Sequence, residues 1–202
     1  MIAGIDHVVL VTLDLASTVA EWRERGFAVH MGGAHAGGLS ENALVGLADG
    51  SYVELFAFVD LARARTAHPW APVAERGGGW ADFALASDDL ARDAAALGDL
   101  VARPPEDGGR TRPDGLRVAW RSARLVSPLP FLIQDVTARE LRVPSGEAAR
   151  HANGTSGIAS VIVGARDPHA VTRRYAMLRD IGAPPIEIVA AERDGLREVT
   201  FR

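Results

Sequence analysis

The sequence predicts an α+β fold made from a strand–helix–strand–strand–strand unit that occurs twice and then a third time in incomplete form. A glycine followed by an apolar strand with a polar fourth residue begins each unit, and these polar residues are His7, Asp82 and Ser160. A segment with helix-capping signals follows each of these strands. Further apolar strands follow each helix, and Asp-Gly turns join some of them. The sequence therefore divides into repeated modules.

The first unit has the clearest strands. Residues 4–11 form a continuous apolar run, and a helix should begin after Asp14 and end at Gly26. Strands are expected over residues 27–31, 42–47 and 51–58, with a glycine-rich loop over residues 32–37. The Asp49-Gly50 pair predicts a hairpin between the last two strands, because Asp-Gly suits tight hairpin turns.

The second unit follows the same order with weaker signals. A strand begins at Gly79, and Ser87 or Asp88 should cap a helix that ends at Gly98. Strands are expected over residues 101–103, 116–121 and 130–136. Residues 60–79, 104–113 and 137–154 are expected to be plain connectors.

The third unit stops one strand short of the others. Asp167 should cap its helix, Pro168 suits the first helical position, and Gly182 ends it. Two strands, over residues 186–191 and 196–201, are joined across Asp194-Gly195. We therefore expect one domain over residues 1–150, made of two βαβββ modules (1–60 and 79–137), and an incomplete βαββ module over residues 151–202.

The edge of this incomplete sheet should be covered. The third module is therefore expected either to pack on the first two or to complete a sheet with another subunit. The second arrangement would make a homodimer, which is the assembly we expect.

Composition excludes several classes of function. The net charge is −4 with no basic tract, so neither nucleic acid nor a membrane surface is an expected partner. No long apolar run or charged leader is present, and we expect a cytoplasmic protein. The chain has no cysteine and no lysine, which excludes thiolate and Schiff-base chemistry. No nucleotide-binding glycine signature occurs, so no organic cofactor is expected.

Two strands each carry one ionisable residue inside an apolar run. His7 shares a strand face with Val9 and Val11, and Glu54 shares one with Phe56, because side chains alternate along a strand. A carboxylate on such a face needs a partner, a proton or a metal. We predict that His7 and Glu54 meet in one concave site, as a metal-binding pair, a metal-free acid–base pair or a hydrogen-bonded pair in the core.

The repeated unit and several motifs resemble those of the vicinal oxygen chelate superfamily (glyoxalase I, extradiol dioxygenases and bleomycin-resistance proteins), and more closely its glyoxalase-like domain branch. The resemblance covers nearly the whole chain. The motifs that carry it span residues 5–10 (Ile-Asp-His-Val-Val-Leu), 32–37, 41–44, 49–55, 112–116, 129–134 and 151–154. It implies that the two complete modules form a cupped mixed sheet.

The resemblance also implies a set of metal ligands. In metal-dependent members the ligands lie on the first and last strands of each unit, which correspond here to His7 and Glu54, then Asp82 and either Ile133 or Gln134. We expect His7, Glu54, Asp82 and Gln134 to be the ligands. Asp82 and Gln134 depart from the usual His and Glu, so this set would suit Mn, Fe(II), Ni or Mg better than Zn.

Further residues complete the expected site. His35 is a candidate catalytic residue, with a solvated loop histidine as the alternative. Candidate substrate-binding residues are Asn42, Tyr52, Phe56, Trp80, Trp120, Phe131 and Arg112. Arg110, Arg112, Arg117 and Arg121 could grip an anion, although a solvated face is the more common role of such arginines. His68 is expected to pack a connector.

The resemblance implies three functions that the sequence leaves open. The first is a lyase, isomerase or dioxygenase-type enzyme acting on a small oxygenated metabolite, with or without a divalent metal. The second is a metal-free protein that binds or sequesters a small molecule. The third is an oligomeric module with a vestigial site. One fold can carry all three, so the side chains of the site must decide between them.

Overall fold

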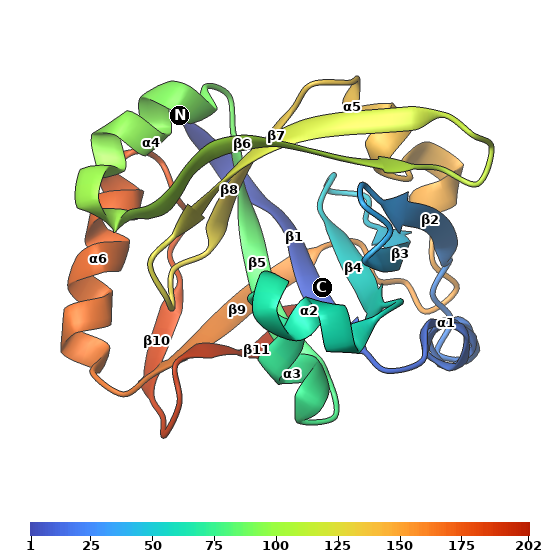
Figure 1. Ribbon diagram of the computed structural model, residues 1–202, viewed down its shortest axis with the longest axis horizontal. Coiled ribbons are helices and arrows are strands. Elements are labelled where there is room, and N and C mark those ends of the chain that lie inside the picture. Colours follow the sequence, from blue (N-terminus) through green and yellow to red (C-terminus); the bar gives the residue numbers. More distant parts are fainter.

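Eight strands close into a barrel in the computed structural model, which describes all residues 1–202, and three further strands form a separate sheet. The barrel order is β1-β4-β3-β2-β6-β7-β8-β5, and the second sheet has the order β10-β9-β11 (Figure 1). This confirms the predicted α+β class and the curled mixed sheet.

Each complete module supplies one half of the barrel. The first contains β1 (Ile2–Thr12), α1 (Leu15–Glu24), β2 (His30–His35), β3 (Ser40–Gly46) and β4 (Tyr52–Phe58). The second contains β5 (Gly79–Ser87), α4 (Leu90–Leu97), β6 (Val101–Thr111), β7 (Arg117–Leu125) and β8 (Phe131–Asp135). In each module the first strand runs parallel to the last. Antiparallel pairs β1–β5 and β2–β6 join the halves.

Several predicted boundaries were wrong. The strand expected over residues 27–31 begins at His30 and continues through the glycines to His35, because β2 pairs with both β3 and β6. Residues 104–111 are not a loop but part of β6, and register shifts in its pairing with β7 accommodate Pro104 and Pro105. Asp89, rather than Ser87 or Asp88, caps α4.

The connectors also contain helices. Residues 60–79 include α2 (Leu61–Ala67) and α3 (Ala71–Glu75), and residues 137–154 include α5 (Arg139–Arg142). Short 3-10 turns lie at Gly98–Leu100 and Gly146–Ala149. These segments have few apolar residues at helical spacing, so a periodicity argument does not detect them.

The third module consists of β9 (Ile158–Ala165), α6 (Pro168–Asp180), β10 (Glu187–Ala190) and β11 (Gly195–Phe201). β10 and β11 do not pair with each other, because β9 lies between them. This module packs on the outside of the barrel, with α6 across the view from α1 and Phe201 of β11 reaching Trp22 of α1 (Figure 1). The buried Tyr175 hydroxyl donates to the carbonyl of Pro128, and β11 contacts β5.

Two apolar layers follow from strand alternation. Val8, Leu55 and Phe83 point out of the barrel into a core cluster that α1, α4 and α6 cover. Val9, Phe56 and Phe131 point inward and belong to a smaller cluster inside the barrel. The outer cluster includes residues from the third module, and the division at residue 150 stays a prediction. No helix combines the length and apolar character needed to cross a bilayer.

Candidate functional site

The barrel encloses a cavity of about 330 Å³ that contains the two residues singled out above. His7 on β1 and Glu54 on β4 both line it, and both side chains are buried. The parallel pairing places Glu54 opposite Val9, two residues from His7, so the two side chains share the inner face. His7 Nε2 lies 3.6 Å from Glu54 Oε2.

A break in strand pairing orients His7. The register of β1 against β5 shifts between Ile5 and His7, which leaves Asp6 without a partner in β5. Such a bulge re-aims a side chain, and it lets two consecutive residues approach each other. The Asp6 carboxylate consequently lies 2.6 Å from Nδ1 of His7.

Two arginines keep Asp6 ionised. Arg142 donates to both of its carboxylate oxygens, at 3.2 and 3.0 Å, and Arg139 also donates to it. Burial favours protonation of Asp6, but the hydrogen bond with His7 and the charge of Arg142 outweigh it. The pKa of Asp6 is therefore held well below its usual range.

An ionised Asp6 fixes the tautomer of His7. Nδ1 must carry a proton, since a carboxylate only accepts hydrogen bonds. In the neutral imidazole this leaves Nε2 as an acceptor, facing Glu54. The ring is held by stacking on Tyr52, with centroids 4.5 Å apart, and by an edge contact with Phe131. His7 is thus arranged as a proton acceptor directed into the cavity.

Glu54 has its own supporting residues. Asn42 Nδ2 donates to Oε1 at 2.7 Å, and His35 Nε2 lies 3.3 Å from the same oxygen. The Ser40 hydroxyl lies 3.0 Å from the other nitrogen of His35. Burial would raise the pKa of Glu54, but the hydrogen bond and charge of His35, with His7, lower it to about 2. Glu54 is therefore a carboxylate at neutral pH.

The predicted ligand set is not assembled. Asp82 Oδ2 accepts from Arg124 at 2.8 Å and from the indole of Trp70 at 3.1 Å. Gln134 lies outside the barrel, where its amide bonds the backbone of Leu90 and Asp88 at the start of α4. At the last strand of the second module it is Ile133 that lines the cavity.

The predicted metal site therefore does not form, because the side chains of His7, Glu54, Asp82 and Gln134 do not converge on one point. No group of three or more histidine, cysteine or carboxylate side chains is spaced to hold a metal ion.

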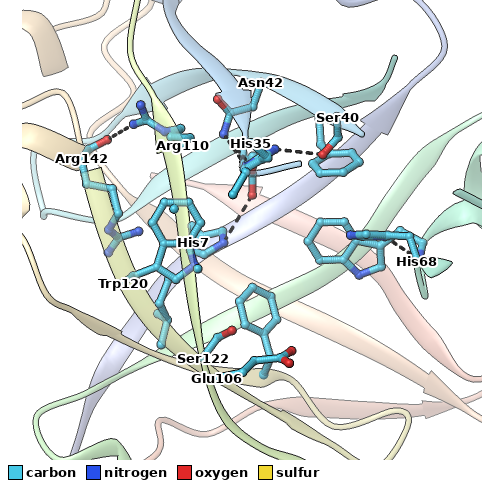
Figure 2. A pocket seen from close by; sticks show the side chains of 18 of the residues that line it. His7, His35, Ser40, Asn42, His68, Glu106, Arg110, Trp120, Ser122 and Arg142 are labelled. Atoms are coloured by element: carbon cyan, nitrogen blue, oxygen red, sulfur yellow. Dashed lines mark hydrogen bonds and ion pairs between the residues drawn. The ribbon is translucent and has the colours of Figure 1, made fainter. Parts of the chain in front are cut away.

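Most of the other predicted residues line the cavity. His7, His35 and Asn42 point toward its centre in Figure 2, and Tyr52, Phe56, Trp120 and Phe131 supply walls. Two residues do not reach it. Trp80 lies on the outer face of β5, where it packs near Phe201, and Arg112 pairs with Asp114 and bonds the Leu141 carbonyl.

The sequence did not predict several of the residues that line the cavity. His68 does more than pack a connector: it lines the cavity opposite Arg110 and Arg142 in Figure 2. Trp70, Ser122 and Arg124 also line it. Trp120, Ser122 and Arg124 alternate along β7, so extending that predicted strand by a few residues would have placed all three on one face.

A closed barrel of two βαβββ units, with polar side chains of the first module converging in its cavity, defines a protein of the vicinal oxygen chelate type. The chain belongs to the glyoxalase-like domain family, because the sequence profile of that family matches residues 5–178. The sequence matches none of the curated proteins compared with it.

Comparison with solved structures gives matches at low sequence identity, and the first two below share the fold. A hypothetical protein from Staphylococcus aureus is 15% identical, with a TM-score of 0.75 over 95% of this chain and 87% of the other. A xylose isomerase-like TIM barrel/4-hydroxyphenylpyruvate dioxygenase fusion protein is 14% identical, with a TM-score of 0.54 over 100% of this chain and 36% of its own. Streptomyces coelicolor methylmalonyl-CoA epimerase is 22% identical, with a TM-score of 0.49 over 68% of this chain and 100% of its own.

Proposed function

We propose that the protein is an enzyme of the lyase or isomerase kind, which transfers a proton on a small oxygenated metabolite. The observation that carries this proposal is a histidine held by a carboxylate at Nδ1 and directed by Nε2 toward a second carboxylate inside a cavity. Asp6 and Glu54 flank His7 in this arrangement. A base with a fixed tautomer, inside a cavity of suitable size, is the combination that general acid–base catalysis needs.

The chemistry follows from the two faces of the imidazole. Nε2 of His7 removes a proton from a carbon or hydroxyl next to the carbonyl of the substrate. The imidazolium that forms is stabilised by Asp6 on one side and Glu54 on the other, as electrostatic complementarity to developing charge requires. His7 then returns the proton to another atom of the same molecule or to a leaving group.

His35 and Asn42 act through Glu54 in this proposal. Both contact Oε1, which leaves Oε2 as the oxygen that faces His7. They are positioning residues, since their contacts fix the direction of the carboxylate.

The test is exchange of a substrate proton with solvent. Small 2-hydroxy and 2-oxo acids are incubated with the protein in D₂O, and ¹H NMR follows loss of the proton next to the carbonyl or hydroxyl carbon. Exchange that disappears in His7→Gln and Glu54→Gln supports the proposal. Exchange that persists unchanged in both variants would overturn it.

A second candidate is a protein that binds a small molecule without turnover. The aromatic walls favour it, because Phe56, Trp70, Trp120 and Phe131 surround the polar pair. Tight binding of an aromatic ligand, together with no exchange of any tested acid, would support this function over the first.

Four finer expectations stay predictions: a dioxygenase-type reaction, a bound divalent metal, a homodimer and a cytoplasmic location. A dioxygenase would need a redox metal, whereas Asp82 and Gln134 of the predicted ligand set bond Arg124 and the start of α4. Metal analysis of protein purified without chelator tests the expectation of Mn, Fe, Ni, Mg or Zn. Size exclusion with light scattering tests the expected homodimer, and fractionation of cells tests the expected cytoplasmic location.

A further inference from the structure

Arg124 is one of three arginines that line the cavity, and an ion pair and two aromatic rings hold its side chain. It projects from β7 and donates to Asp82 Oδ2 at 2.8 Å. Its guanidinium carbon lies 4.8 Å from the ring centroid of Trp70 and 4.6 Å from that of Phe131. One ion pair and two aromatic faces therefore fix the plane of the guanidinium.

The three arginines that line the cavity differ in what occupies their N–H groups. Arg110 donates to the carbonyls of Gly32 and Arg142. Arg142 donates to Asp6, to Asp135 and to the Tyr52 hydroxyl. Arg124 has one bonded acceptor among its five N–H donors, the Asp82 carboxylate. It therefore has the donors left for a ligand.

The surroundings of Arg124 suit an anion. Ser122 lies two residues away on β7 and lines the same cavity, which adds a hydroxyl on the same strand face. Nδ1 of His68 accepts from the Trp70 backbone, so the neutral ring carries its proton on Nε2. Glu106 and Asp107 also line the cavity, but both are exposed, so solvent and salt screen their charge.

Arg124 and His7 contact the same aromatic ring. The edge of the His7 imidazole meets Phe131 at a centroid distance of 5.3 Å, and the Arg124 guanidinium lies over that ring at 4.6 Å. Phe131 therefore lies next to both the proposed base and the cation, on one part of the cavity wall. A small molecule with an anionic group at one end and an acidic proton nearby matches this layout.

We propose that Arg124 binds a carboxylate group, so that the substrate of the His7–Glu54 pair is a small carboxylic acid. The claim that the bound acid is a substrate rests on the proposed function. Binding of a carboxylate by Arg124 does not require turnover. The planar fork of a guanidinium bonds both oxygens of a carboxylate, and a guanidinium already packed against two rings loses little entropy on binding.

The experiment compares binding of acids and their neutral isosteres. The probes are lactate, mandelate and phenylacetate with their primary amides, and the readouts are calorimetry and quenching of tryptophan fluorescence. We expect at least one acid to bind about tenfold more tightly than its amide, the scale of one charge-assisted hydrogen-bonded pair. In Arg124→Gln that preference should disappear.

Variants separate recognition from folding. Arg124→Gln with Asp82→Asn removes both members of the ion pair, and Arg124→Lys keeps the charge without the planar fork. The double variant should lose the preference and Arg124→Lys should retain part of it, each with a normal circular dichroism spectrum. Arg121→Gln, on the same strand but outside the cavity, should bind like the wild type.

Two results would overturn the proposal: no acid binding more tightly than its amide, or an acid preference that survives Arg124→Gln and the double variant. Failure of the proposed function looks different. In that case acids bind through Arg124, yet no proton exchange occurs in D₂O. If proton exchange depends on His7 but no acid binds more tightly than its amide, the carboxylate site is ruled out and the proposed function stands.

Discussion

Nε2 of His7 lies 3.6 Å from Oε2 of Glu54, although 46 residues separate the two along the chain. Parallel pairing of β1 with β4 brings them to one face of the barrel wall. Each residue is supported separately, His7 by Asp6 and Glu54 by Asn42 and His35. The pair therefore has independent supports that can be removed one at a time.

Loss of the Glu54 charge should slow proton transfer. Glu54→Gln keeps the shape of the side chain but cannot stabilise the imidazolium of His7, and we expect the exchange rate to fall by about 10²–10⁴-fold. Glu21→Gln changes an exposed glutamate on α1 and should leave the rate unchanged. Equal rates in wild type and Glu54→Gln would remove Glu54 from the mechanism.

The partner of Asp6 should matter for stability. Arg142→Met leaves the Asp6 carboxylate buried without its main cation, and breaking a buried ion pair in this way costs about 3–5 kcal/mol. Urea unfolding monitored by circular dichroism measures the change in the free energy of unfolding. Arg150→Met, in an exposed pair with Glu147, should change it by less than about 0.5 kcal/mol. Similar values for both variants would contradict this role of Arg142.

Gly32 makes room for the amide that holds Glu54. A Cβ at position 32 would lie 2.0 Å from Asn42 Oδ1, so Gly32→Ala must displace the Asn42 side chain. We expect lower stability and slower exchange, measured by urea unfolding and ¹H NMR. Adding Asn42→Ala removes the side-chain clash and should recover part of the stability but not the exchange. Restored exchange in that double variant would show that Asn42 does not position Glu54.

His68 should link stability to pH. Burial, with the positive charge of Arg124, lowers the pKa of His68 to about 4 from its ordinary value of 6.5. The unfolded chain therefore binds more protons between these two values, and the free energy of unfolding should fall as the pH falls from 6.5 to 4. In His68→Gln this slope should diminish, whereas His169→Gln, at an exposed position on α6, should keep it. An NMR titration of His68 near pH 6.5 would contradict the expectation.

Residues on regular strands could be placed from the sequence, and those that depend on irregular backbone could not. His7, Glu54 and Phe131 lie on strands whose alternation is visible in the sequence, so the predicted cup contains them. Of the two residues considered at the end of β8, Ile133 lines the cavity and Gln134 faces α4.

The role of Asp6 depends on a bulge, which no hydrophobic period reveals. Arg142 and His68 reach the site from short connecting segments, and their positions follow from tertiary packing rather than local pattern. Arg124 was not predicted as a cavity residue because the strand expected over residues 116–121 ended before it.

The protonation of His7 can be measured directly, without knowledge of a substrate. Long-range ¹H–¹⁵N NMR of the histidine rings reports which nitrogen carries a proton and whether the other responds to Glu54. The account predicts that Nδ1 of His7 is protonated throughout the folded pH range and that Glu54→Gln shifts the Nε2 resonance. A neutral ring with its proton on Nε2 and a free Nδ1, or an Nε2 resonance that ignores Glu54→Gln, would contradict it.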